Sequence, residues 1–201
     1  MSVICCVYHP EYLIFGADSR LTDIHDGHVI TDQAEKIFPL SEDCVAVYCN
    51  RNRILDKSVH QFLHEFEQMN GSLDAQKKAQ LLQISLKENN EDTVLFLAQR
   101  EKGTIYLFEI SKTGVIWWNK ENKSGLIWRE PSDVLHRLFN SEPRLLISYM
   151  DLSAYDASDL AEFVCGVCIN ADRFTNSGNK CGGKTNVYLL SLYESRFLKR
   201  K

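Results

Sequence analysis

The sequence lacks the features that would direct it to a membrane or to nucleic acid. No apolar run approaches the roughly 20 residues that a helix needs to cross a bilayer, and residues 1–7 lack the basic start of a signal peptide. Basic residues are not in excess either, because the formal net charge is -4 and the pI is near 5.9. We therefore expect a cytoplasmic protein with neither a membrane nor a nucleic-acid partner.

Internal repeats and low-complexity linkers are also missing. The 201 residues are enough for one well-packed domain and few for two, so we expect a single domain spanning residues 1–201. Cysteine, by contrast, is not scarce. Most of the seven cysteines lie inside apolar runs, where they behave as small hydrophobic residues. Cys165 and Cys168 have redox or metal spacing, but they fall inside a predicted helix without a second pair, which favours the core.

The pattern of apolar residues predicts two packed sheets with a helical layer on each outer face. Residues 1–7 and 12–20 are rich in β-branched and aromatic side chains around a short turn, which predicts an opening β-hairpin. Further strands are predicted at residues 28–31, 44–49, 93–99, 103–110, 115–119 and 185–192. Helices are predicted at residues 52–69, 72–88, 131–139, 143–149 and 157–173.

Several segments resemble one known family. They are Ser2-Val3-Ile4, Gly16-Ala17-Asp18-Ser19-Arg20, Ala34-Glu35-Lys36-Ile37-Phe38-Pro39-Leu40 and, before the last predicted strand, Cys181-Gly182-Gly183. Together with the strand at residues 44–49, they are similar to a proteasome β-type subunit, which is an N-terminal nucleophile hydrolase. The resemblance implies an α+β fold, namely a four-layer αββα sandwich of two mainly antiparallel sheets flanked by helices.

The resemblance implies a catalytic site formed by Ser2, Asp18 and Lys36. The aspartate of the family lies sixteen residues after its nucleophile, as Asp18 does after Ser2, and its lysine heads a Lys-aliphatic-Phe segment, as Lys36 does. The chemistry requires removal of Met1, because the free α-amine of Ser2, with a pKa near 8, would take the proton of the serine hydroxyl. A side chain as small as serine at position two favours that removal. Lys36 would then donate to the hydroxyl oxygen, and Asp18 would hold the lysine charged.

The resemblance also implies a supporting set around these three residues. The backbone N–H of Asn50 would face the developing oxyanion. Arg20, Ser124 and Cys181 match further positions of the family, with Ser124 matched only through a loosely similar Lys-Ser-Gly segment.

The chain departs from the family pattern at this supporting set. Asn50 stands where the family usually has glycine, and Cys181 stands where it has serine. Gly178 occupies the position of a supporting aspartate, so Ser177 or Asn179 would have to replace that carboxylate through hydrogen bonds.

The residues leave more than one function open. The first is a peptidase that hydrolyses peptides or unfolded proteins as a homo-oligomer, in a ring or a related assembly, without cofactor or metal; an ATPase partner is left open. The second is a catalytically inactive proteasome-like subunit with an assembly or binding role, and the third is an amidohydrolase acting on a small amide. Because Asn50, Arg51 and Arg53 follow a predicted strand of the site, we hypothesise an acidic residue beside the cut bond.

Other residue patterns suggest sites less strongly. His60 and His64 lie one helical turn apart, as metal ligands can, but a solvated helix face explains them without a third ligand. The polar segment 23–28 could hold a metal or form a hairpin tip. Aromatic residues that could pack at a subunit contact or on a partly buried sheet face are Trp117, Trp118 and Trp128.

Overall fold

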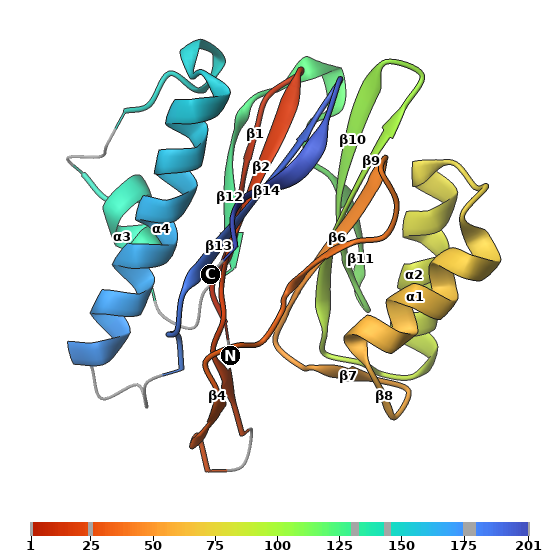
Figure 1. Ribbon diagram of the computed structural model, residues 1–201, viewed down its shortest axis with the longest axis horizontal. Helices are drawn as coiled ribbons and strands as arrows, with labels where there is room; N and C mark the ends of the chain where they lie inside the picture. Colours follow the sequence, from red (N-terminus) through yellow and green to blue (C-terminus); the bar gives the residue numbers. More distant parts are fainter. Residues whose placement is uncertain (1, 24–25, 130–132, 143–145, 175–179, 201) are drawn as a thin grey trace.

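The computed structural model describes residues 2–23, 26–129, 133–142, 146–174 and 180–200. Two five-stranded sheets form its centre, and in both of them neighbouring strands are antiparallel (Figure 1). The first sheet has the order β12 (Gly125–Arg129), β1 (Ile4–Tyr8), β2 (Tyr12–Asp18), β13 (Thr185–Ser191), β14 (Ser195–Lys199). The second has the order β11 (Gly114–Trp117), β10 (Thr104–Ser111), β9 (Val94–Glu101), β6 (Cys44–Cys49), β5 (Ile37–Pro39).

Two short hairpins and four α-helices complete the described ranges. The hairpins are β3 (Leu21–Thr22) with β4 (Val29–Thr31), and β7 (Arg53–Ile54) with β8 (Lys57–Ser58). The helices are α1 (Val59–Asn70), α2 (Ala75–Glu88), α3 (Val134–Asn140) and α4 (Ala154–Phe174), and two 3₁₀ turns lie at Lys120–Asn122 and Tyr149–Asp151. The predicted combination of helices with antiparallel sheets is confirmed. None of the helices within these ranges combines the length and the apolarity needed to span a membrane.

Strand β1 shows how the core is divided. All five of its residues are buried, and the period of two places alternate side chains on opposite faces. Ile4, Cys6 and Tyr8 belong to an apolar cluster that contains residues of both sheets. Cys5 and Val7 belong to a cluster shared with α3 and α4. Burial on both faces explains why this segment is apolar throughout rather than alternating.

The helices lie on the outer side of each sheet in Figure 1. A separate apolar cluster joins α1 and α2 to the second sheet. Helix α1 begins after Ser58, whose hydroxyl accepts a hydrogen bond from the Gln61 N–H at 3.1 Å, and α2 begins after Asp74, which accepts from the Lys77 N–H at 2.8 Å. These caps place both helix starts later than the apolar spacing predicted.

The structure corrects two further predictions and adds a strand. The start of the helix predicted at residues 52–69 is instead the β7–β8 hairpin, whose turn residues Leu55 and Asp56 have φ values of 51° and 60°. Residues 146–148, predicted as helical, are not helical. Ile147 packs against the apolar cluster shared with α3 and α4, but Leu146 is 78% exposed, and so little apolar contact does not stabilise a short helix. Strand β14 was not predicted.

Candidate functional site

Asp18 is the centre of the candidate site, and its side chain is fully buried at the end of β2. Its Oδ1 accepts hydrogen bonds from the Lys36 ammonium at 2.6 Å and from the Val3 N–H at 3.0 Å. Its Oδ2 accepts from the Gly182 N–H at 3.1 Å and the Arg20 N–H at 3.3 Å. A carboxylate buried in this way is tolerated because it is both paired with a cation and hydrogen-bonded.

Ser2 reaches the site through its neighbour Val3. The Asp18 N–H donates to the Val3 carbonyl at 3.2 Å, so Val3 both donates to and accepts from Asp18. Because Val3 and Lys36 donate to the same carboxylate oxygen, Ser2 lies one residue away from the ion pair. Its side chain and backbone together are 7% exposed. The structure therefore brings the predicted residues Ser2, Asp18 and Lys36 into one buried corner.

Lys36 enters this corner from the other sheet. It directly precedes β5, and its carbonyl accepts a hydrogen bond from the Tyr48 N–H of β6 at 3.1 Å. The pairing of Ile37 with Val47 sets the register of this edge. The Lys36–Asp18 ion pair therefore connects the two sheets at the position where the chain begins.

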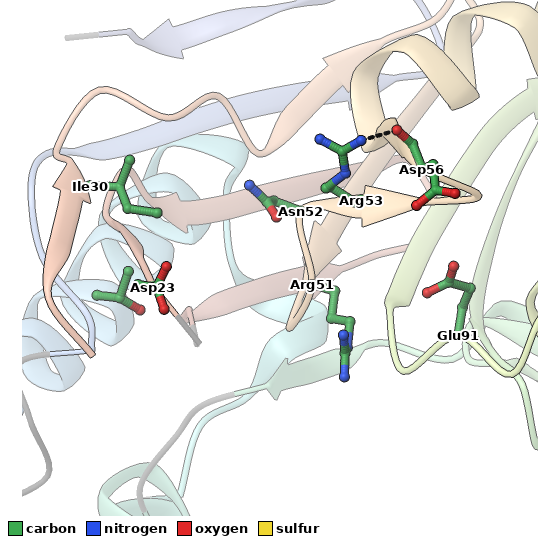
Figure 2. A pocket seen from close by; sticks show the side chains of 8 residues that line it. Asp23, Ile30, Arg51, Asn52, Arg53, Asp56 and Glu91 are labelled. Atoms are coloured by element: carbon green, nitrogen blue, oxygen red, sulfur yellow. Dashed lines mark hydrogen bonds between the residues drawn. The ribbon is translucent and has the colours of Figure 1, made fainter. Parts of the chain in front are cut away.

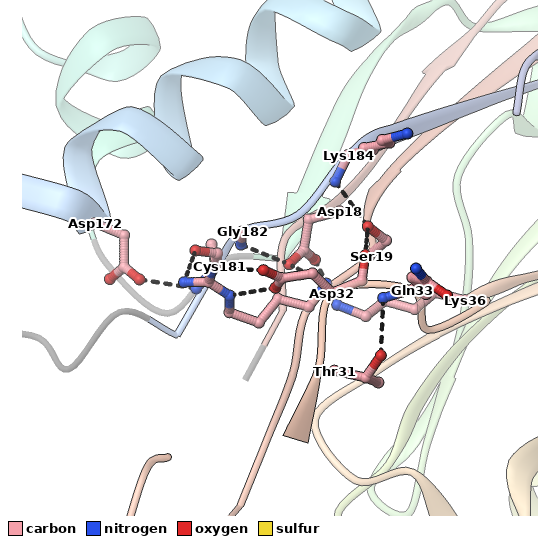
Figure 3. Close-up of polar contacts among 11 residues, drawn as sticks. Asp18, Ser19, Thr31, Asp32, Gln33, Lys36, Asp172, Cys181, Gly182 and Lys184 are labelled. Carbon is pink, nitrogen blue, oxygen red and sulfur yellow. Dashed lines mark hydrogen bonds and ion pairs between the residues drawn. The ribbon is translucent and has the colours of Figure 1, made fainter. Parts of the chain in front are cut away.

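Two glycines allow the segment before β13 to approach the end of β2. The Ser19 N–H donates to the Gly182 carbonyl at 3.2 Å, and a Cβ on Gly182 would lie 2.3 Å from the guanidinium carbon of Arg20. Gly183 has a φ of 72°, and a Cβ there would lie 2.4 Å from the Ser19 hydroxyl. Position 183 therefore requires glycine, whereas a side chain at Gly182, which is labelled in Figure 3, would displace the guanidinium of Arg20.

Asp172 is a buried residue of the site that the sequence analysis missed. It lies near the end of α4, is 1% exposed, and accepts a hydrogen bond from the Cys181 N–H at 2.8 Å (Figure 3). The sequence analysis expected Ser177 or Asn179 to replace a supporting aspartate at the position of Gly178. All three of these residues lie outside the described residues. A signal was present in the sequence, because Asp172 follows Cys165 and Cys168 at helical spacing, on the face that packs inward.

Arg20 lies at the edge of the site and holds two neighbouring segments together. Its guanidinium makes two hydrogen bonds to the Asp32 carboxylate, at 2.7 and 3.0 Å, and a third at 3.5 Å to the Cys181 carbonyl. The hydrogen bond from Arg20 lowers the pKa of Asp32. This bidentate pair fixes the loop before Lys36 against the end of β2.

Asn50 follows β6 with a φ of 75°, a left-handed conformation that asparagine tolerates better than most residues. This conformation accounts for an asparagine at position 50, because most other side chains would be more strained there. Its side chain donates to the Asp92 carbonyl at 3.0 Å. The role of its N–H toward an oxyanion stays a prediction.

The neighbouring thiols are poor competitors for the nucleophile role. Burial raises the pKa of Cys49 to about 12, although the positive charges of Arg129 and Lys36 act in the opposite direction. Burial also raises the pKa of Cys181. Both thiols are therefore protonated at neutral pH.

Ser124 does not belong to the site. In the ladder between β1 and β12, Ile4 pairs with Arg129 and Tyr8 pairs with Gly125. Ser124 therefore lies beyond the far end of β1, roughly 20 Å along the strand from Ser2 at about 3.3 Å per residue. The prediction that Ser124 supports the site was wrong, because the antiparallel pairing places the end of β12, rather than its start, beside the start of β1.

The remaining sequence patterns have local explanations. The His60 ring stacks on Phe38 with centroids 5.0 Å apart, and His64 is hydrogen-bonded to Gln68 at 3.0 Å. The Cys165 sulfur lies in the core, 3.9 Å from the Cys5 sulfur. Each of the three tryptophans packs on an aromatic residue or hydrogen-bonds within this chain: Trp117 with Phe108, Trp118 with Glu109, and Trp128 with Phe139.

The polar segment at the β3–β4 turn brings Asp23, Asp26 and His28 together, with potential ligand atoms within 4.8 Å of one another. Asp26 and His28 already form a hydrogen bond of 2.6 Å, which raises the pKa of His28. This contact explains the proximity of these two side chains without a metal.

A cavity of about 330 Å³ lies between the β3–β4 and β7–β8 hairpins (Figure 2). Charged side chains from both sides line it, including Asp23, Arg51, Arg53 and Glu91. A second cavity, of about 510 Å³, shares Asp23 and Arg51 with the first and extends to Asn50. Charged side chains thus contribute to the lining of both cavities.

Comparison with known proteins does not name a family for this chain. No protein-family model matches it, and no curated protein matches it. The geometry around Ser2, Asp18 and Lys36 therefore carries the functional interpretation.

Proposed function

We propose that this protein is an N-terminal nucleophile hydrolase that resembles a proteasome β-type subunit and cleaves peptide bonds with Ser2. In this proposal, the two sheets and their outer helices form the four-layer αββα sandwich of that family. One observation carries the proposal: Asp18 binds the Lys36 ammonium and the N–H next to Ser2 with a single buried oxygen. That arrangement fixes a cation and the start of the chain together.

The proposed reaction uses the first residue as both nucleophile and base. After removal of Met1, the α-amine of Ser2 accepts the proton of its own hydroxyl, and the Oγ attacks the carbonyl carbon of the scissile bond. The positive charge of Lys36 disfavours protonation of the amine, and Asp18 holds Lys36 in place. The proton then passes to the leaving amine, and water hydrolyses the resulting ester. The Asn50 N–H would stabilise the oxyanion formed in each step.

The proposed assembly is a homo-oligomer, a ring or a related arrangement, located in the cytoplasm. The substrates in this proposal are peptides or unfolded proteins, and the protein uses no cofactor. Native mass spectrometry tests the oligomeric state directly: a monomer at micromolar concentration would contradict this part of the proposal.

A catalytically inactive subunit is the second candidate. The burial of Ser2, which is 7% exposed, favours it, because a nucleophile must be reached by substrate. Retention of Met1 would also leave Ser2 without a free α-amine. Intact mass measurement on protein from its native cell decides this point, because retention of Met1 contradicts the proposed mechanism. A screen of small amides separates peptidase from amidohydrolase activity.

Covalent trapping tests the nucleophile itself. A hydroxyl-reactive peptide electrophile should label Ser2, and peptide mapping should locate the adduct there. The seven cysteines are buried, which limits competing labelling. Ser2→Ala should abolish both labelling and hydrolysis, whereas Ser124→Ala, which removes a hydroxyl at the far end of β1, should preserve both. Unchanged hydrolysis in Ser2→Ala would contradict the proposal.

A further inference from the structure

The cavity of about 510 Å³ reaches Asn50, the residue whose N–H would stabilise the oxyanion in the proposed function. Its lining includes Thr22, Asp23, Asn50, Arg51, Asp92 and Lys180. Asn50 follows Cys49, and Lys180 precedes Cys181. The Tyr48 N–H donates to the Lys36 carbonyl at 3.1 Å, and the Gly182 N–H donates to Asp18 at 3.1 Å. Asn50 and Lys180 therefore each lie two residues along the chain from a contact of the Asp18–Lys36 corner. The volume suits one or two side chains of a bound peptide.

Arg51 is a cation of this lining whose guanidinium is available to a ligand. Its guanidinium lies 3.8 Å from the Asp92 carboxylate, too far for a hydrogen bond, and its side chain is 50% exposed. Asp92 instead forms an ion pair of 2.6 Å with Lys112, and that contact lowers the pKa of Asp92. Lys112 therefore balances the Asp92 charge, and Arg51 keeps donors that can meet another carboxylate.

The neighbouring arginine does not have this freedom. Arg53 donates to the Asp56 carbonyl, and Figure 2 shows its guanidinium turned toward Asp56, away from that of Arg51. Two adjacent arginines that look equivalent in the sequence thus have different surroundings. Arg51 lines both cavities, whereas Arg53 lines the one of about 330 Å³.

The other charges of the lining oppose each other. Lys180 adds a second cation on the side of Cys181. Asp23 is an acid of the same lining, but it lies within 4.8 Å of the His28 and Asp26 side chains, and its charge favours the protonated form of His28. With Asp92 held by Lys112, Arg51 and Lys180 outweigh Asp23 in the field that a ligand meets.

We infer that this cavity binds an acidic side chain of the substrate, next to the bond that is cut, and that Arg51 is the main residue that selects it. That the ligand is a substrate rests on the proposed function, whereas the binding of a carboxylate by Arg51 does not depend on it. A planar guanidinium can bind both oxygens of an aspartate or glutamate side chain. A glutamine in the substrate has only one such oxygen, and a lysine in place of Arg51 would lack the two parallel donors. Lys180 would add charge without fixed geometry.

The test uses peptides of one sequence in which glutamate is moved through each position and compared with glutamine. Hydrolysis is measured with the protein lacking Met1, and binding is measured by fluorescence anisotropy with its Ser2→Ala variant. At the best position, glutamate should be preferred about fivefold, as expected for about 1 kcal/mol from a half-exposed ion pair. Arg51→Gln should remove the preference, and Arg51→Glu should shift it toward lysine.

The matched control is Arg196→Gln, which removes an arginine of similar exposure on β14, where its partner is Glu194. This variant should keep the glutamate preference. Equal use of glutamate and glutamine at every position overturns the inference, and so does a preference that survives Arg51→Gln or an absence of any peptide binding. Glutamate-selective binding through Arg51 without hydrolysis would support the inference while contradicting the proposed function.

Discussion

Replacing Asp18 with asparagine gives the most direct test of the buried site. The substitution leaves the Lys36 side chain, which is fully buried, without its carboxylate. Removing one partner of a buried ion pair typically destabilises a protein by about 3–5 kcal/mol. A folded domain is stable by only about 5–15 kcal/mol, so Asp18→Asn should lose a large fraction of its free energy of unfolding.

The partner substitution should be milder. In Lys36→Met the Asp18 carboxylate loses its cation but keeps three backbone donors, from Val3, Gly182 and Arg20. We expect a loss of about 2–3 kcal/mol, because hydrogen bonds to a charged group still compensate part of its burial. The double variant Asp18→Asn/Lys36→Met contains no buried charge at this position. It should be about 1–2 kcal/mol more stable than Asp18→Asn alone.

Urea denaturation followed by tryptophan fluorescence measures all four proteins of this cycle. The double variant also separates folding from catalysis, because it should be folded and yet fail to hydrolyse peptides. A cost below about 1 kcal/mol for Asp18→Asn would refute the buried ion pair. Hydrolysis by the folded double variant would refute the proposed role of Lys36.

Three further predictions concern packing, ionisation and thiol reactivity. Gly16→Ala should destabilise by about 1–3 kcal/mol, because the added Cβ would lie within 3.1 Å of two buried sulfurs and a main-chain oxygen of α4. Gly166→Ala should stabilise by about 0.5–1 kcal/mol, because Gly166 lies in α4 and an added Cβ there would meet open space. Urea denaturation of both variants checks the opposite signs. Asp32→Asn should cost no more than about 1 kcal/mol at pH 7, because this carboxylate is 46% exposed. Arg20 lowers the pKa of Asp32 in the folded protein. The stability gained from this pair is therefore present above the unfolded-state pKa of about 3.9 and is lost as the pH falls through the folded-state pKa. In a pH series, the free energies of unfolding of wild type and variant should converge in acid. Burial raises the pKa of Cys49 to about 12, and all seven cysteines are buried. Iodoacetamide at pH 8 should therefore label the native protein slowly and the urea-unfolded protein fully. Rapid labelling of the native protein, measured by mass spectrometry, would contradict this burial.

The sequence determined the local elements and the residues of the central site. Strands β1 and β2 were predictable because both carry continuous apolar runs on either side of a short turn, and such runs are typical of strands buried on both faces. The spacing of Asp18 from Ser2 and the motif around Lys36 also depend only on positions along the chain. The structure places these three residues together, as the resemblance implied.

Only the tertiary structure decided which distant segments meet. The antiparallel register of β12 moved Ser124 away from Ser2, and the end of α4 supplied Asp172 to the Cys181 backbone. The difference between Arg51 and Arg53 likewise arises from their partners across two hairpins. Local patterns report the conformation and burial of a segment, whereas register and side-chain pairing depend on how segments far apart in sequence pack together. That is why the proximity of Ser2, Asp18 and Lys36 was predictable and the residues that surround them were not.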